Sequence, residues 1–256
     1  MSGYELIKVT EADRAAYLNL ARPPLNVLNI AMITEINQYL ESLLERRDLC
    51  VLVIRGEGKH FCAGVDIPEH KPDTVATMLG TFHQMFRLLH RLPMPTLCAV
   101  HGGAYGGGAE VAMFCDVILG ADDLKIGVPE ITLGVFPPLA IAHLAKLVGI
   151  HRAAELIYTG TVIDGAEALR IGLVNHLVPA SELADATDKW TRRFTKLSAF
   201  SLGQAREAFR RVVMSDFEQA LEGAEQGYLE KLMAGQDPVE GLEAFMAKRA
   251  PSWSDR

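Results

Sequence analysis

The chain has 256 residues, of which 49% are hydrophobic and 22% charged, a composition typical of a globular protein with a sizeable core. Its formal net charge of -7 at pH 7 argues against broad nucleic-acid binding, which needs clustered Lys and Arg. We find no apolar run of membrane-spanning length and no basic leader after Met1, so we expect a soluble cytoplasmic protein without a membrane partner.

Strand and helix signals alternate through the first half of the chain. Residues 5–10 and 15–20 are predicted to form a hairpin, and the apolar spacing from Met32 to Leu44 predicts a helix. Three apolar runs predict buried strands: 49–55, 96–100 and 117–120. Strands separated by helices indicate a largely parallel α/β sheet.

Strand signals become sparse after about residue 140, and helical patterns replace them. The predicted helical segments are 153–158, 165–171, 182–197, 202–213, 216–233 and 238–248. We therefore expect an α/β core over residues 1–195, followed by a helical C-terminal region over residues 196–256.

The four cysteines are Cys50, Cys62, Cys98 and Cys115. Their spacing is wrong for a metal cluster, and the chain is too large to depend on a disulfide framework. We expect buried free thiols in a reducing compartment and no metal site.

A glycine-rich run from Gly102 to Glu110 follows the predicted strand 96–100 and leads into a helix. It does not fit the dinucleotide pattern G-x-G-x-x-G, which would need a glycine in place of Val111. Free N–H groups where the helix begins can stabilise a negative oxygen, so one interpretation is an oxyanion hole. The alternative is a glycine turn that merely lets the strand and the helix pack closely.

Two glutamates occupy places where a core would not favour them. Glu110 precedes the apolar stretch 111–114, and Glu130 follows Pro129. A buried carboxylate is costly unless it has a partner or a task, so the pair suggests acid/base chemistry on a small molecule. The alternatives are a helix N-terminal carboxylate for Glu110 and a surface charge for Glu130. His101, beside the glycine run, is interpreted as structural.

Together these segments resemble the crotonase (enoyl-CoA hydratase/isomerase) superfamily nearly from end to end. The matching segments are 22–28, 61–67, 102–110, 115–116, 129–134, 159–160, 166–174 and 240–249. The resemblance implies a ClpP-like α/β fold, in which repeated ββα units form a spiral core that carries the acyl-CoA site. It also implies an acyl-CoA thioester substrate and no separate cofactor, because coenzyme A is part of the substrate.

By the same resemblance, the backbone N–H groups of Ala63 and Gly107 form an oxyanion hole for a thioester enolate. Glu110 and Glu130 match the two carboxylates of the family's hydratases, which favours hydration or dehydration. The implied CoA-binding residues are Leu25, Ala63, Asp66, Ile67, Phe245 and Lys248. For the last two, the alternatives are a core anchor and a solvated charge.

The segment after Glu130 departs from the pattern of short-chain enoyl-CoA hydratases, because Val135, Phe136 and Pro137 lie where those proteins have a glycine-rich loop. We expect these three residues to shape the acyl pocket. Segments 23–29 and 133–138 resemble the branch that hydrates cyclohexa-1,5-diene-1-carbonyl-CoA in anaerobic aromatic-acid degradation. Glu110 is expected to handle the water and Glu130 the proton, with the opposite or a shared assignment left open.

Two other functions stay open. One is a generic short-chain enoyl-CoA hydratase or isomerase. The other is a catalytically silent acyl-CoA binder or RNA-binding relative, against which the acidic net charge and the paired glutamates count. Relatives are usually trimers or dimers of trimers, so a homotrimer or homohexamer is expected.

Overall fold

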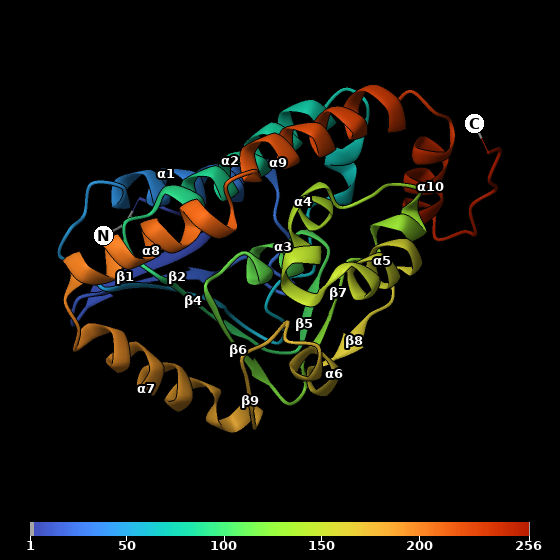
Figure 1. The fold of residues 1–256 in the computed structure, drawn as a ribbon. Helices are drawn as coiled ribbons and strands as arrows, with labels where there is room; N and C mark the ends of the chain where they lie inside the picture. The colour runs from blue at the N-terminus through green and yellow to red at the C-terminus, as the bar shows by residue number, and fades with distance from the viewer. Residues whose placement is uncertain (1–2, 256) are drawn as a thin grey trace.

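The computed structural model describes residues 3–255. A six-stranded sheet lies at the centre of the fold (Figure 1). Its strands, in spatial order, are β1 (Ile7–Ala12), β2 (Ala15–Leu20), β3 (Val51–Gly56), β4 (Thr96–Val100), β6 (Val117–Ala121) and β9 (His176–Val178). The first two strands form the predicted antiparallel hairpin, and every later pairing is parallel. The predicted, largely parallel α/β sheet is confirmed.

A second, three-stranded sheet carries the glycine run. It has the order β5 (Gly103–Tyr105), β7 (Lys125–Gly127) and β8 (Ile163–Asp164). β5 also meets the loop after β3 through a bridge between Ala104 and Cys62. The sequence did not indicate β5, β7, β8 or β9, because strands of two or three residues are too short to show an alternating pattern.

Ten α-helices surround the sheets within residues 3–255. Their bounds are α1 (Ile30–Leu43), α2 (Val75–Arg91), α3 (Gly107–Met113), α4 (Pro138–Val148), α5 (Ile150–Thr159), α6 (Gly165–Arg170), α7 (Leu183–Thr195), α8 (Ala199–Val213), α9 (Phe217–Gln226) and α10 (Asp237–Met246). Shorter helical segments are η1 (Ile67–His70), η2 (Pro129–Leu133), η3 (Ala180–Glu182) and the π-helical η4 (Gly227–Leu232). In this part of the chain, no helix is both long and apolar enough to span a bilayer.

Both faces of the central sheet are buried. Successive side chains of a strand point to opposite faces, so each strand contributes residues to both. In β3, Val51 and Val53 join one cluster of buried residues, whereas Leu52 and Ile54 join the other. The helix α7 packs against the first cluster, on the opposite side of the sheet from α1 and α2 (Figure 1). This arrangement explains the continuous apolar run seen in the sequence.

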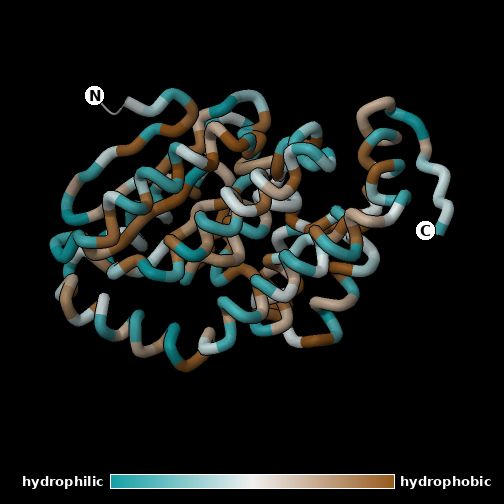
Figure 2. Tube along the Cα trace, turned by 90° about the horizontal axis from the view of Figure 1, so that it is seen from above, coloured by the Kyte–Doolittle hydropathy of each residue, from teal (hydrophilic) through white to brown (hydrophobic). Residues whose placement is uncertain are grey.

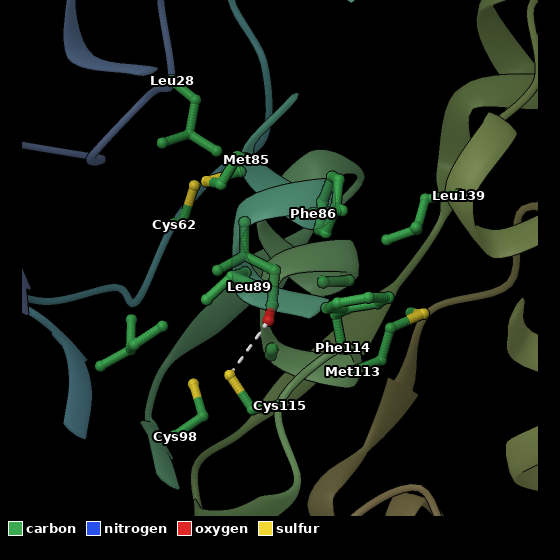
Figure 3. Close-up of a cluster of buried hydrophobic side chains, with 14 of the residues drawn as sticks. Leu28, Cys62, Met85, Phe86, Leu89, Cys98, Met113, Phe114, Cys115 and Leu139 are labelled. Atoms are coloured by element: carbon green, nitrogen blue, oxygen red, sulfur yellow. Dashed lines mark hydrogen bonds between the residues drawn. The ribbon is translucent and has the colours of Figure 1, made fainter. Parts of the chain in front are cut away.

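The cluster that includes Leu52 and Ile54 is the larger of the two, and it contains three of the four cysteines. Figure 3 shows Cys62, Cys98 and Cys115 among side chains of α2 and α3, with a hydrogen bond from the Cys115 thiol to the Val111 carbonyl. All four thiols are free and buried, as predicted. Burial raises the pKa of Cys62 to about 12, so this thiol stays protonated and unreactive near neutral pH.

The C-terminal helices pack back onto the core. Phe217, Leu221 and Tyr228 belong to the same buried cluster as the sheet residues, and α10 contacts η1 and η2. Figure 2 shows α10 at one end of the molecule, with alternating hydrophobic and hydrophilic turns. The division of the chain at residue 195 stays a prediction, since the buried core continues across it.

A buried ion cluster anchors α8 to the sheet. Asp116, just before β6, accepts hydrogen bonds from Arg206 at 2.8 Å and from Arg210 at 2.7 Å, and also from the Thr96 backbone N–H at 2.8 Å. Burial alone would raise the pKa of Asp116, but the two arginine charges and their hydrogen bonds lower it to about 2. The cluster therefore holds the start of the C-terminal region against the edge of the sheet where β4 and β6 begin.

Candidate active site

A cavity of about 570 Å³ lies between the glycine run, the loop after β3 and the C-terminal helices, a size typical of small-molecule sites. Apolar side chains supply most of its wall. Polar groups enter from the start of α3, from η2 and from the η4 segment. The cavity thus combines an apolar interior with a few convergent polar groups.

Glu110 lies on α3 and is 2% exposed. Its Oε1 accepts a hydrogen bond of 2.9 Å from the Ala140 N–H where α4 begins. Burial raises the pKa of Glu110 to about 7, although backbone N–H groups of Leu139 and Ala140 oppose the rise. The carboxyl is consequently able to gain and lose a proton near neutral pH.

Glu130 reaches the same cavity from η2. Its Oε2 is withdrawn from solvent and has no hydrogen-bond partner among residues 3–255. Burial, and then the charge of Glu110, raise the pKa of Glu130 well above its usual range. When two carboxylates repel one another, one of the two carboxyls ionises only at a higher pH than the other. Glu130 is therefore the member of the pair that keeps its proton more readily.

Gly106 allows the carboxyl of Glu130 to approach the start of α3. Its φ of 51° lies in the left-handed region that side chains other than glycine avoid. A Cβ at this position would lie 2.7 Å from Glu130 Oε1. The glycine run is thus more than a packing turn, because it makes room for an acidic side chain.

The backbone donors differ from the sequence prediction at one position. The Ala63 N–H donates to the Leu25 carbonyl at 2.9 Å, so the predicted use of Ala63 as an oxyanion donor is corrected. Gly64, at φ 107°, follows it and redirects the chain. The next N–H group, that of Val65, has no backbone partner among residues 3–255.

Val65 and Gly107 lie against one another in the cavity wall. A Cβ at Gly107 would come within 2.6 Å of Val65 Cγ2, and both residues line the cavity. The Gly107 N–H is the first of α3 and likewise has no backbone partner among residues 3–255. Both amides thus lie in the cavity wall without a backbone partner among residues 3–255.

The three residues expected in the acyl pocket, Val135, Phe136 and Pro137, all line the cavity. Phe136 meets the ring of Tyr228 edge-on, with ring centroids 5.2 Å apart. Val135 is 1% exposed. The segment after Glu130 therefore forms an apolar wall beside the carboxyl pair.

Most of the expected CoA-binding residues also surround the cavity. Those that line it are Leu25, Ala63, Asp66, Ile67 and Phe245. Phe245 is 55% exposed, so it is not the core anchor considered as its alternative. Lys248 does not line the cavity within this chain, and its CoA role stays a prediction.

Two residues of the site escaped the sequence prediction. The direction of the Val65 N–H depends on backbone pairing, and Tyr228 lies in a helical pattern that gives no sign of its position.

His101 has a structural place, as interpreted, with Nε2 2.9 Å from the Gly58 carbonyl. Among residues 3–255 there is no group of three or more His, Cys, Asp or Glu that could hold a metal ion.

The family model for enoyl-CoA hydratase/isomerase matches residues 10–256. A cyclohexa-1,5-dienecarbonyl-CoA hydratase of Thauera aromatica is 41% identical over 239 residues, which are 93% of this chain and 92% of that relative. A probable enoyl-CoA hydratase of Mycobacterium bovis is 36% identical over 256 residues, 99% of each chain. The crystal structure of an enoyl-CoA hydratase from Mycobacterium avium subsp. paratuberculosis superposes with a TM-score of 0.88 at 27% identity, covering 98% of this chain and 99% of that one. The expected crotonase fold is confirmed.

Proposed function

The chain belongs to the enoyl-CoA hydratase/isomerase family, and we propose that it hydrates cyclohexa-1,5-diene-1-carbonyl-CoA in the anaerobic degradation of aromatic acids. Its enzyme class is enoyl-CoA hydratase, a hydro-lyase acting on an acyl-CoA thioester. The observation that carries the proposal is the meeting of two buried carboxyls with raised pKa values in one apolar cavity. An isomerase or a silent binder would not need both.

We assign the oxyanion hole to the backbone N–H groups of Val65 and Gly107. The thioester carbonyl oxygen gains negative charge as the enolate forms, and fixed amide donors stabilise that charge more than the neutral carbonyl. Losing one such donor typically costs about 3–4 kcal/mol of transition-state stabilisation. Support for this assignment comes from their shared place in the cavity wall and from the Ala63 amide's bond to Leu25.

The pKa values favour ionised Glu110 as the base and protonated Glu130 as the acid. Glu110 takes a proton from water while the water oxygen forms a bond to the β carbon. The electron pair of the double bond moves toward the thioester oxygen and forms an enolate. Glu130 then gives a proton to a carbon of the conjugated system. The net change is the addition of one water molecule.

The cyclic substrate is favoured by the apolar wall and by the relative from Thauera aromatica. Phe136 and Pro137 provide flat, bulky contacts that suit a ring more than a short linear chain. The relative named for the cyclic dienoyl-CoA is 41% identical to this chain, whereas the probable enoyl-CoA hydratase of Mycobacterium bovis is 36% identical. A ring also places the β carbon and the conjugated system in one fixed plane.

The test compares hydration of cyclohexa-1,5-diene-1-carbonyl-CoA with that of crotonyl-CoA by the same enzyme preparation. We expect higher kcat/KM for the cyclic thioester, and products labelled by heavy-oxygen water. Equal or better turnover of crotonyl-CoA would exclude the cyclic assignment. Rearrangement without incorporation of the label would identify an isomerase.

We also propose that the chain forms a homotrimer or a dimer of trimers. Helix α8 exposes Phe209 and Val212, which lie three residues apart on one face of the helix and are each more than 60% accessible, and apolar side chains exposed together are typical of a surface that a further protein copy covers. Sedimentation velocity would measure the mass in solution. A species of one chain's mass at micromolar concentration would exclude the proposal.

A further inference from the structure

Tyr228 is a cavity residue whose hydroxyl has no hydrogen-bond partner among residues 3–255. The side chain is 1% exposed and belongs to the η4 segment that follows α9. A buried hydroxyl without a hydrogen-bond partner destabilises the folded state. Its retention beside a reaction site therefore calls for a role in binding or catalysis.

The same wall contains a second unpartnered buried polar atom, Oε2 of Glu130. A hydroxyl can donate a hydrogen bond and a carboxyl oxygen can accept one, so the two groups are complementary to one small oxygen species between them. Water and an alcohol hydroxyl both have this donor and acceptor capacity. The thioester oxygen does not, because it only accepts.

Tyr228 remains a donor throughout the neutral pH range. Burial, and then the charges of Glu130 and Glu110, raise the pKa of its phenol above the usual value. The ring is fixed by its edge-on contact with Phe136, and η4 is a π-helical turn, a rare geometry frequently found at functional sites. The phenol is thus a positioned donor that acts on whatever enters beside the carboxyls.

We propose that the Tyr228 hydroxyl donates a hydrogen bond to the oxygen of the reacting water, which becomes the β-hydroxyl of the product. The proposal rests on the hydratase function above and adds a third polar group to the two glutamates. The forming C–O bond takes its electrons from the water oxygen, and the proton released passes to Glu110. Tyr228 keeps its own proton and orients the oxygen toward the β carbon, so it is a positioning residue for water and a binding residue for the β-hydroxyl.

The first test is the hydration rate of Tyr228→Phe. We expect kcat to fall about 5- to 30-fold, the value of one hydrogen bond of about 1–2 kcal/mol. KM for the acyl-CoA is expected to stay within about twofold, because the hydroxyl contacts the water and not the thioester. The unfolding midpoint in urea is expected to stay equal or to rise, since the removed hydroxyl has no hydrogen-bond partner among residues 3–255.

Tyr39→Phe is the matched control. Tyr39 is also buried, at 5% exposure, and its hydroxyl is also unpartnered among residues 3–255, but it does not line the cavity. We expect the control variant to hydrate at the wild-type rate. Equal loss of activity in both variants, or unchanged kcat in Tyr228→Phe, would overturn the proposal.

The second test needs no turnover and therefore separates this proposal from the assigned reaction. Calorimetry would compare binding of 3-hydroxybutanoyl-CoA and butanoyl-CoA, which differ only in the β-hydroxyl. We expect the wild type to bind the hydroxylated thioester more tightly than butanoyl-CoA. In Tyr228→Phe the ratio of the two dissociation constants should be at least fivefold smaller, without weaker binding of butanoyl-CoA. An undiminished preference in the variant, or none in the wild type, would refute the role of Tyr228 even in an active hydratase. If no enoyl-CoA is hydrated while the preference depends on Tyr228, the reaction assignment fails and the hydroxyl site stands.

Discussion

Replacing Glu110 with Gln should make the protein less active and, above neutral pH, more stable. The folded state holds this carboxyl at a pKa of about 7, compared with 4.5 for an unperturbed glutamate. Between pH 4.5 and 7 the unfolded chain therefore binds fewer protons than the folded one. Stability falls as pH rises through that window and stays lower above it.

The magnitude follows from the two pKa values. At about 1.36 kcal/mol per pH unit, the penalty for ionising buried Glu110 amounts to about 3 kcal/mol above pH 7. Gln has the same shape, and its oxygen can still accept the Ala140 N–H, but it carries no charge to desolvate. Loss of the proposed base should lower the hydration rate by about 10²- to 10⁴-fold.

The assay is urea unfolding of both proteins at pH 4.5 and pH 8, at one fixed protomer concentration. We expect the variant to gain about 2–3 kcal/mol relative to the wild type between the two pH values. Glu222→Gln, at an exposed position of α9, serves as the control and should show no such gain. If wild type and Glu110→Gln had the same pH dependence, the carboxyl would not be desolvated and the reasoning would be refuted.

Three further predictions concern the rest of the molecule. Plots of kcat against pH should be bell-shaped, rising near pH 7 as the base ionises and falling at higher pH as Glu130 loses its proton, whose pKa is raised well above the usual range; a flat profile from pH 6 to 10 would contradict the assigned roles. Asp116→Asn should lower the free energy of unfolding by about 3–5 kcal/mol at pH 7, because Arg206 and Arg210 lose their buried counter-charge. Since the folded pKa of Asp116 is about 2, the wild type loses this contribution as pH falls from about 4 to 2. Unfolding followed by circular dichroism, in acid and in urea, would measure both effects. Gly106→Ala should displace the Glu130 carboxyl, which would lie 2.7 Å from the new methyl group, and lower kcat at least tenfold; retention of full activity in stopped assays would show that Glu130 does not need its observed position.

The sequence could predict features that leave a local pattern. The hairpin, the apolar strands and the helix predicted from Met32 to Leu44 all have periodic or uninterrupted apolar residues, and each was found close to its expected bounds. α2 also has a helical apolar face that includes Met78, Phe82 and Phe86, yet it and α4 were not anticipated. Sheet order depends on distant pairing, which no short window contains.

The site was predictable where a residue's chemistry is unusual for its surroundings. Glu110 and Glu130 could be singled out because charged residues are unusual beside apolar ones in a sequence. Both line one cavity, as expected. The choice between Ala63 and Val65 was not predictable, because it depends on the φ angle of Gly64 and on the bond to Leu25. Tyr228 becomes part of the site only when the C-terminal helices fold back, a long-range event without a local signal.

The cavity wall uses residues from both ends of the chain, from Leu25 near the start to Met246 near the end. During synthesis the central sheet can assemble early, because its last strand ends at Val178. The binding pocket, however, is incomplete until α10 has emerged from the ribosome. A prematurely terminated chain could therefore bury much of its core and resist proteolysis while lacking one wall of its catalytic cavity, so that acyl-CoA binding would report completion of the polypeptide more faithfully than folding does.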